Sequence, residues 1–178
     1  MQMGHHVTGV DVNEFDDVAD RTNAFFRADL NDGIPAEVGS GFDIVLAADV
    51  LEHVVNPGVL MSQIRAVLSP TGTALLCVPN IAHWYPRFRS TLGMFDYDQR
   101  GILDATHLRF FTRRSLTRLV ARGGFAIRRI EPLGLPLDAL GVDSTKGRTL
   151  RLADRLLSGM WPTMFGYQFL VEATPVRA

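Results

Sequence analysis

The segment from residue 42 to residue 53 constrains the fold of this chain more than any other. Residues 44–48 form a short, nearly all-apolar run, and its length suits a strand buried on both faces of a parallel sheet. The run stops at Asp49, and a helical pattern carrying Glu52 and His53 follows. Ligands of open α/β sheets bind at the carboxyl ends of the strands. The sequence therefore predicts that chemistry takes place around Asp49, Glu52 and His53.

Strands and helices alternate along the rest of the chain. The patterns predict strands over residues 7–11, 23–30, 44–48, 73–78, 125–130 and 165–173. They predict helices over residues 57–68, after Asn56 as N-cap, 113–122, after Thr112 as N-cap, and 149–160. We expect residues 69–72 to form a turn and residues 133–148 a loop. This rhythm indicates an α/β fold in one domain covering residues 1–178.

Two stretches carry apolar residues at helical spacing. Residues 79–106 are rich in aromatic residues and arginine, and we expect them to form an inserted lid. Trp84, Phe88 and Leu92 are four residues apart, which favours a short amphipathic helix within it. The alternative is that these aromatic residues only cover the core. In the last predicted helix, the leucines at 152, 156 and 157 should face inward.

Composition argues against a protein drawn to nucleic acid by its net charge and against one that spans a membrane. The chain has 178 residues, 47% of them hydrophobic, which is enough for a real core. Its formal charge of -1 gives no general attraction to nucleic acid. The one cysteine, Cys77, lies in an apolar run and should be a buried strand residue. No apolar run is long enough to span a bilayer. We expect a cytoplasmic protein and do not favour membrane contact; the alternative is that the stripe from Trp84 to Leu92, which lies beside arginines, touches a membrane surface.

Three acids, Asp11, Asp29 and Asp49, each stand at the end of a predicted strand. Together with the segments 42–53, 68–72, 107–112 and 167–169, they occur in an order and spacing that resemble the class I S-adenosylmethionine-dependent methyltransferases. The resemblance implies a Rossmann-like sheet that ends in an antiparallel C-terminal strand. It also implies that the first strand of the family and its glycine-rich loop are absent here. That strand would lie between those at residues 7–11 and 44–48.

The resemblance also implies a cofactor site for S-adenosylmethionine. Asp11 would bind both ribose hydroxyls, because a carboxylate can accept from two donors at once. Asp29 would accept from the adenine amino group, with the Leu30 backbone N–H at the ring edge. Val12, Ala48 and Asp49 complete the expected set. The alternatives are a solvated acid at position 11 and a turn-forming acid at position 29.

The spacing of Asp49, Glu52 and His53 has two interpretations. An acid followed three residues later by Glu is a capping box, which satisfies backbone N–H groups at the start of a helix. The three side chains would also share one helix face and could hold a divalent ion. A similar run is associated with a metal in ubiquinone-pathway O-methyltransferases. We favour capping and assign no metal ligands.

Two histidines are candidate catalytic bases. His53 follows the strand that ends at Asp49, and His107 lies between the expected lid and the helix that begins after Thr112. An imidazole whose pKa is near neutrality can take a hydroxyl proton as a methyl group arrives. The alternatives are a pocket residue at position 53 and a loop histidine that bonds the backbone at position 107.

These features predict methylation of an oxygen on a small molecule, such as a sugar hydroxyl or a lipid-linked glycan. One alternative is a truncated, non-catalytic domain that does not bind the cofactor. Another is a nucleotide-dependent oxidoreductase or epimerase, since an acid after the second strand also fits such folds. The chain has no Tyr-x-x-x-Lys pair for that chemistry, because its single lysine, Lys146, has Val142 four residues before it.

Overall fold

A computed structural model describes residues 4–136 and 144–176. The strands are β1 (Thr8–Asp11), β2 (Ala24–Arg27), β3 (Phe42–Ala48), β4 (Leu68–Pro79), β5 (Phe125–Leu133) and β6 (Gln168–Pro175). The helices are α1 (Val18–Arg21), α2 (Pro57–Val67), α3 (Trp84–Thr91), α4 (Arg113–Arg122), α5 (Ser144–Met160) and α6 (Pro162–Phe165), with a 3-10 turn at Ala36–Val38. None of the helices in these two ranges is long and apolar enough to cross a membrane.

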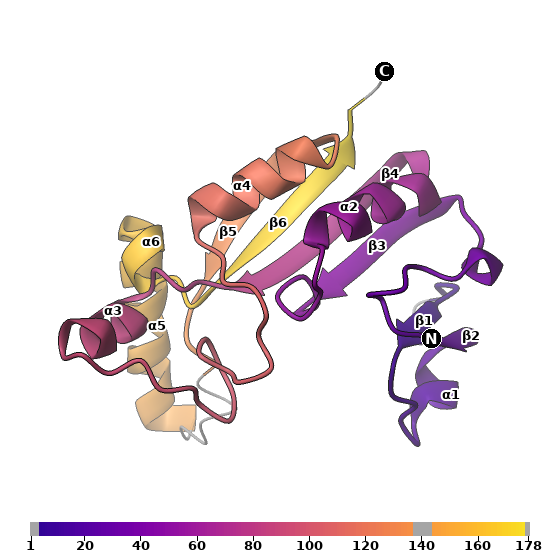
Figure 1. Ribbon diagram of the computed structural model, residues 1–178. Coiled ribbons are helices and arrows are strands. Elements are labelled where there is room, and N and C mark those ends of the chain that lie inside the picture. The colour runs from indigo at the N-terminus through magenta and orange to yellow at the C-terminus, as the bar shows by residue number, and fades with distance from the viewer. Residues whose placement is uncertain (1–3, 137–143, 177–178) are drawn as a thin grey trace.

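The main sheet has four strands in the order β3-β4-β6-β5. β3 and β4 are parallel, whereas β6 is antiparallel to both of its neighbours. Helices α2 and α4 lie together along one face of this sheet (Figure 1). The result is a mixed α/β sheet whose C-terminal strand is antiparallel, as the sequence predicts.

The hydrophobic core lies between this sheet and its two helices. Leu60, Met61 and Ile64 of α2 and Leu116 and Val120 of α4 are buried against the sheet. Strand β6 contributes alternating buried residues, which include Phe169 and Val171, whereas residues 76–79 of β4 are all buried. Cys77 is also buried, as expected. The apolar periodicity of the sequence therefore identifies the core correctly in this region.

Strands β1 and β2 form a separate parallel pair. Figure 1 shows this pair beyond β3, at the opposite end of the molecule from α5 and α6. Consequently β3 is an edge strand, and the side chains of Ile44 and Leu46 are 59% and 65% exposed. The prediction that residues 44–48 are buried on both faces is therefore wrong. The strand that the resemblance implies is absent would lie between β1 and β3. At this point the described strands form two separate sheets instead of one.

Both predicted helix starts at N-caps are confirmed. The Asn56 side chain accepts a hydrogen bond from the Val59 backbone N–H at the start of α2. Thr112 and Ser115 form a reciprocal capping box at the start of α4. Such caps satisfy backbone N–H groups that have no partner within the helix.

Several predicted boundaries differ from the structure. β4 begins at Leu68, so the expected turn at residues 69–72 lies within this strand. β2 ends at Arg27, and β6 begins only at Gln168. Within the expected loop at residues 133–148, β5 includes Leu133 and α5 begins at Ser144; residues 137–143 lie outside the described ranges.

The predicted orientation of α5 is wrong. Leu152, Leu156 and Leu157 are 60%, 57% and 44% exposed rather than turned inward. The face of α5 that packs against the protein instead carries small and polar residues, among them Asp154 and Ser158. Apolar spacing predicts that a helix is amphipathic, but it does not say which face meets the rest of the chain.

The predicted helix in the lid is confirmed as α3. Arg89 at its C-terminal end donates hydrogen bonds to both carboxylate oxygens of Asp98, at 2.7 and 2.8 Å, and to the Tyr85 hydroxyl. Trp84 and Phe88 are exposed. This ion pair holds the segment after α3 against the helix, so the lid has a fixed internal geometry.

Candidate functional site

A turn rather than a helix follows β3. Asp49 has a φ of 52°, in the left-handed region where Asp is among the better tolerated residues. The next helix begins only at Pro57. The Asp49 carboxylate accepts a hydrogen bond from Gln168 Nε2 at 2.7 Å and caps no helix. The predicted capping box at Asp49 and Glu52 is therefore wrong, as is the shared helix face.

This turn buries the side chain of Glu52, which is 1% exposed. Neither carboxylate oxygen has a hydrogen-bond partner among the described residues. Burial raises the pKa of Glu52 to about 8, and the nearby Asp49 carboxylate acts in the same direction. Glu52 is therefore mostly protonated and uncharged at neutral pH.

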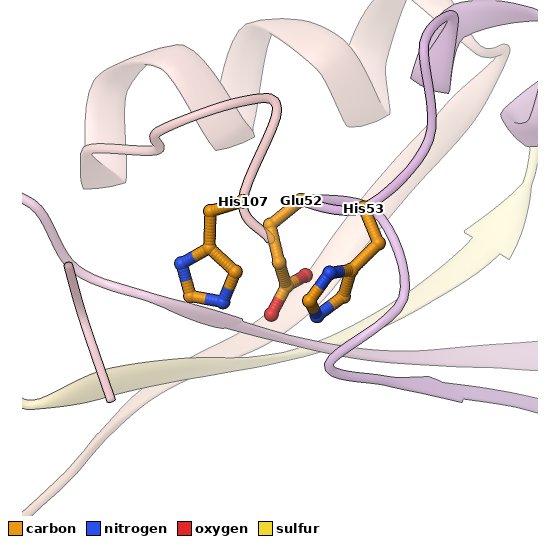
Figure 2. A group of neighbouring side chains, drawn as sticks. All are labelled: Glu52, His53 and His107. Atoms are coloured by element: carbon orange, nitrogen blue, oxygen red, sulfur yellow. The ribbon is translucent and has the colours of Figure 1, made fainter. Parts of the chain in front are cut away.

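The two candidate histidines lie side by side around Glu52 (Figure 2). The ring centroids of His53 and His107 are 4.8 Å apart, with an interplanar angle of 69°. His53 Nδ1 lies 3.2 Å from the Thr106 carbonyl oxygen, and His107 Nδ1 lies 3.1 Å from that of Ile102. Because a carbonyl only accepts, these contacts place a proton on each Nδ1, and the Nε2 of a neutral ring in this position has a lone pair.

Backbone hydrogen bonds hold the two histidine segments together. The Glu52 carbonyl accepts from the backbone N–H groups of Leu108 and Arg109, at 2.8 and 3.0 Å. The turn after β3 is thereby joined to the segment before α4, although more than fifty residues separate them in the chain. The relative position of His53 and His107 is thus fixed by the backbone.

A cavity of about 210 Å³ opens beside the histidines. It is lined by Asp49, His53, Pro79, Gly101, Asp104, His107, Tyr167 and Gln168. It lies where β3 and β4 end and β6 begins. A larger cavity of about 440 Å³ lies near the start of β4, but no carboxylate or imidazole lines it. We therefore place the candidate site in the smaller cavity.

The environment of the cavity shifts the pKa values of its ionisable groups. Burial lowers the pKa of His107, so its imidazole is neutral at neutral pH. Hydrogen bonds from the Thr106 hydroxyl and backbone N–H lower the pKa of Asp104, which stays ionised. A neutral imidazole beside an ionised carboxylate can accept a proton and then bear a positive charge.

The cofactor-binding residues that the sequence predicts are divided between two places. Asp49 lines the cavity, and Ala48 precedes it at the end of β3. Asp11 ends β1 and Val12 follows it, whereas Asp29 and Leu30 come after β2, so these four lie at the ends of the strands of the other sheet or just beyond them. None of these four residues lines the cavity. The structure therefore brings Asp49, His53 and His107 together in one cavity that Asp11 and Asp29 do not line.

Asp11 and Asp29 adopt the same local arrangement. The Oδ1 atom of each accepts a hydrogen bond from the backbone N–H two residues later, that of Asn13 or Asn31. This is the turn-forming role that was the alternative for Asp29. Within residues 4–136 and 144–176, the Oδ2 atom of each has no hydrogen-bond partner. The second oxygen can still accept from a ligand.

The residues that could hold a metal differ from the sequence-based set. One ligand atom each from Glu52, His53 and His107 lies within 4.8 Å of the other two, whereas Asp49 is not in this group (Figure 2). Two imidazoles and a carboxylate form a donor set typical of transition-metal sites. The candidate metal ligands are therefore Glu52, His53 and His107, and Asp49 is no longer among them.

Sequence reasoning gave no role to Gln168 or Tyr167. Both line the cavity from the start of β6. Gln168 Nε2 donates to Asp49, and its Oε1 lies 3.6 Å from Cys77 Sγ. Only the antiparallel pairing of β4 with β6 places this glutamine at the site. No local pattern in the sequence signals that pairing.

Comparison with known proteins identifies the family of this chain. A family model described as a methyltransferase domain matches residues 2–130. A ubiquinone biosynthesis O-methyltransferase of Rhodopseudomonas palustris is 32% identical over 88 residues, which are 48% of this chain and 34% of that protein. The matched part therefore spans about a third of this curated relative.

Solved structures share the fold at low identity. An S-adenosylmethionine-dependent methyltransferase from Mesorhizobium loti superimposes with a TM-score of 0.60 and 19% identity, covering 95% of this chain and 80% of that one. An S-adenosylmethionine-dependent methyltransferase from Archaeoglobus fulgidus superimposes with a TM-score of 0.57 and 17% identity, covering 94% of this chain and 75% of that one. The 1,6-didemethyltoxoflavin-N1-methyltransferase of Burkholderia thailandensis was solved with S-adenosylhomocysteine. It superimposes with a TM-score of 0.59 and 18% identity, covering 99% of this chain and 64% of that one. The chain belongs to the S-adenosylmethionine-dependent methyltransferase family.

Proposed function

We propose that this chain transfers a methyl group from S-adenosylmethionine to an oxygen of a small molecule, such as a hydroxyl of a sugar or glycan. One observation carries the proposal. Two imidazoles, each with Nδ1 bonded to a backbone carbonyl, share one cavity where β3 and β4 end. Such a pair can remove the proton that a hydroxyl loses on methylation.

His107 is the proposed base. Its imidazole is 8% exposed, and its lowered pKa keeps Nε2 unprotonated at neutral pH. The bound cofactor supplies an electrophilic methyl group on its sulfonium. Nε2 of His107 takes the hydroxyl proton, and Asp104 and the Ile102 carbonyl stabilise the charged ring. The ring of His53, which is half-buried and so partly exposed to solvent, packs against the ring of His107.

The polar lining supports an acceptor rich in hydroxyl groups. Asp49 and Asp104 present carboxylates to the cavity, and the Tyr167 hydroxyl and the Gln168 amide add polar groups. Carboxylates accept hydrogen bonds from sugar hydroxyls and repel anionic groups. The lid, with the exposed rings of Trp84 and Phe88, offers an apolar surface for the remainder of a larger acceptor such as a lipid-linked glycan.

Asp11 and Asp29 remain the proposed cofactor ligands. Each has one carboxylate oxygen with no partner in the described part of the chain, which fits ribose hydroxyls and an adenine amino group. Val12 and Leu30 are the neighbouring positions after β1 and β2, whereas Ala48 and Asp49 are at the end of β3.

The alternative is a domain that does not bind the cofactor. Calorimetric titration of the purified chain with S-adenosylmethionine and S-adenosylhomocysteine separates the two. We expect micromolar binding that Asp11→Ala abolishes and that a distant acid-to-alanine change, Glu37→Ala, leaves intact. A folded chain that binds neither compound would establish the non-catalytic alternative for this form. Binding would justify a screen of hydroxyl acceptors.

A second candidate use of the cavity is cation binding. The observation that favours it is the cluster of Glu52, His53 and His107, whose carboxylate has no other partner among the described residues. Titration with zinc would release protons if the ion displaced the Glu52 proton. Binding abolished by His107→Ala would support a metal site; heat and proton release unchanged by that variant would exclude these ligands.

A further inference from the structure

Helix α5 presents its apolar side to solvent. Leu152, Leu156 and Met160 are four residues apart and are 60%, 57% and 82% exposed. Leu157 and Trp161, also four apart, are 44% and 54% exposed. With 100° between successive residues, the four helical side chains form one broad stripe along the last turns of α5, and Trp161 follows directly after the helix. Contiguous apolar surface of this kind marks an interaction site.

The opposite side of the helix is already occupied. Gly147 and Ser158 are buried, and the Asp154 carboxylate accepts a hydrogen bond from the Leu135 backbone N–H at 3.1 Å. The Asp154 hydrogen bond joins α5 to the segment after β5, and α5 also contacts α6 and β5. In Figure 1, α5 lies at the end of the molecule opposite β1 and β2. The stripe therefore faces outward on a helix whose inner side is fixed.

The charged residues of α5 indicate which kind of partner its apolar stripe meets. Its sequence contains four basic residues, Lys146, Arg148, Arg151 and Arg155, and one acid, Asp154. The acid is on the packed side, and Arg155 is exposed beside the apolar stripe. Two copies meeting face to face at Leu156 would bring the neighbouring Arg155 side chains together. An anionic surface instead complements them.

We propose that α5 docks the protein on the surface of an anionic phospholipid membrane. The stripe of Leu152, Leu156 and Met160 enters the boundary between head groups and acyl chains, and Arg155 lies at the level of the phosphates. The helix lies in the plane of the membrane and does not cross it. This docking is independent of the proposed methyl transfer, and it departs from the expectation of no membrane contact.

Sedimentation with sucrose-loaded vesicles tests this docking on the intact chain. We expect binding to vesicles of phosphatidylcholine and phosphatidylglycerol, weaker binding to phosphatidylcholine alone, and a loss of binding as salt is added. A folded chain that sediments with neither vesicle would overturn the proposal. Equal binding to both would remove the role of anionic lipid.

Variants identify the surface that binds. The triple variant Leu152→Gln, Leu156→Gln, Met160→Gln should lower vesicle binding by at least about tenfold. Arg155→Gln should lower it about fivefold, and only on anionic vesicles. Val59→Gln, a similarly exposed valine on α2, is the matched control and should bind normally. Circular dichroism shows whether each variant is folded.

The same variants test whether a second copy of the chain, rather than a membrane, covers the apolar stripe. Size-exclusion chromatography coupled to light scattering gives the mass of each protein in solution. A dimer that the triple variant dissociates, without vesicle binding by the original chain, would show that a second copy covers the stripe. Unchanged vesicle binding by the folded triple variant would show that another surface meets the membrane. Either result would contradict the proposal.

Discussion

Asp49 and Gln168 are 119 residues apart in the chain, yet Gln168 Nε2 donates a 2.7 Å hydrogen bond to Asp49 Oδ1. This bond joins the turn after β3 to the start of β6, across the end of β4. It also gives a partner to a residue with a φ of 52°. The cavity that holds both histidines is bounded by this pair.

Gln168→Glu should destabilise the fold at neutral pH. The change is nearly isosteric, but it replaces a donor to the Asp49 carboxylate by a second negative charge. We expect a loss of about 1–2 kcal/mol in the free energy of unfolding, measured with urea at pH 7. Adding Asp49→Asn restores an amide–carboxylate pair and should recover most of the loss. Additive effects of the two changes would contradict a direct interaction.

Glu52→Gln should remove a pH dependence of stability. The folded pKa of about 8 lies above the ordinary value of 4.5, so the folded state keeps a proton that the unfolded state releases. The stability that this proton confers is present below pH 4.5 and is lost as the pH rises toward 8, at about 1.4 kcal/mol per pH unit. Urea unfolding from pH 5 to 8 measures it. The glutamine variant should gain stability relative to the original chain over this range, and parallel curves would refute the raised pKa.

His83 and His107 should titrate below the ordinary imidazole value. Burial lowers the pKa of His83 to about 4 and also lowers that of His107. NMR titration of the ring protons measures both, with His83→Asn and His107→Asn assigning the signals. Each lowered pKa destabilises the fold as the pH falls from 6.5 toward the folded value, because only the unfolded state then binds the proton. A His107 pKa above 6.5 would contradict its role as a neutral base.

Leu46→Lys should reduce self-association without unfolding the protein. Leu46 is 65% exposed on the edge strand β3, and exposed apolar edges promote pairing between copies. We expect the free energy of unfolding to change by less than about 0.5 kcal/mol. Light scattering at increasing concentration measures the association. Leu76→Lys, at a fully buried position of β4, is the control that should fail to fold.

Thr112→Ala should weaken the start of α4. Its Oγ1 accepts a hydrogen bond from the Ser115 N–H, and Ser115 Oγ in turn accepts from the Thr112 N–H. Removing the cap should cost about 1 kcal/mol, measured by urea unfolding. Thr117→Ala, on the exposed side of the same helix, should cost less. Equal losses in the two variants would show that the cap contributes nothing specific.

The sequence by itself determined most of the secondary structure and the class of fold. Asn56-Pro57 and Thr112 mark the starts of α2 and α4, because caps and proline act on their own few residues. The apolar spacing of these helices also identified the core. The motifs at strand ends were sufficient to indicate the methyltransferase family, which the family match supports.

Only the tertiary structure decided which faces and which distant residues meet. It left Leu46 on an open edge, turned Leu156 outward, and buried Glu52 without a partner among the described residues. It also brought His107 against His53 and Gln168 against Asp49. The physical reason is that strand order and helix orientation depend on contacts between segments far apart in the chain. The spacing of residues within one segment carries no record of those contacts.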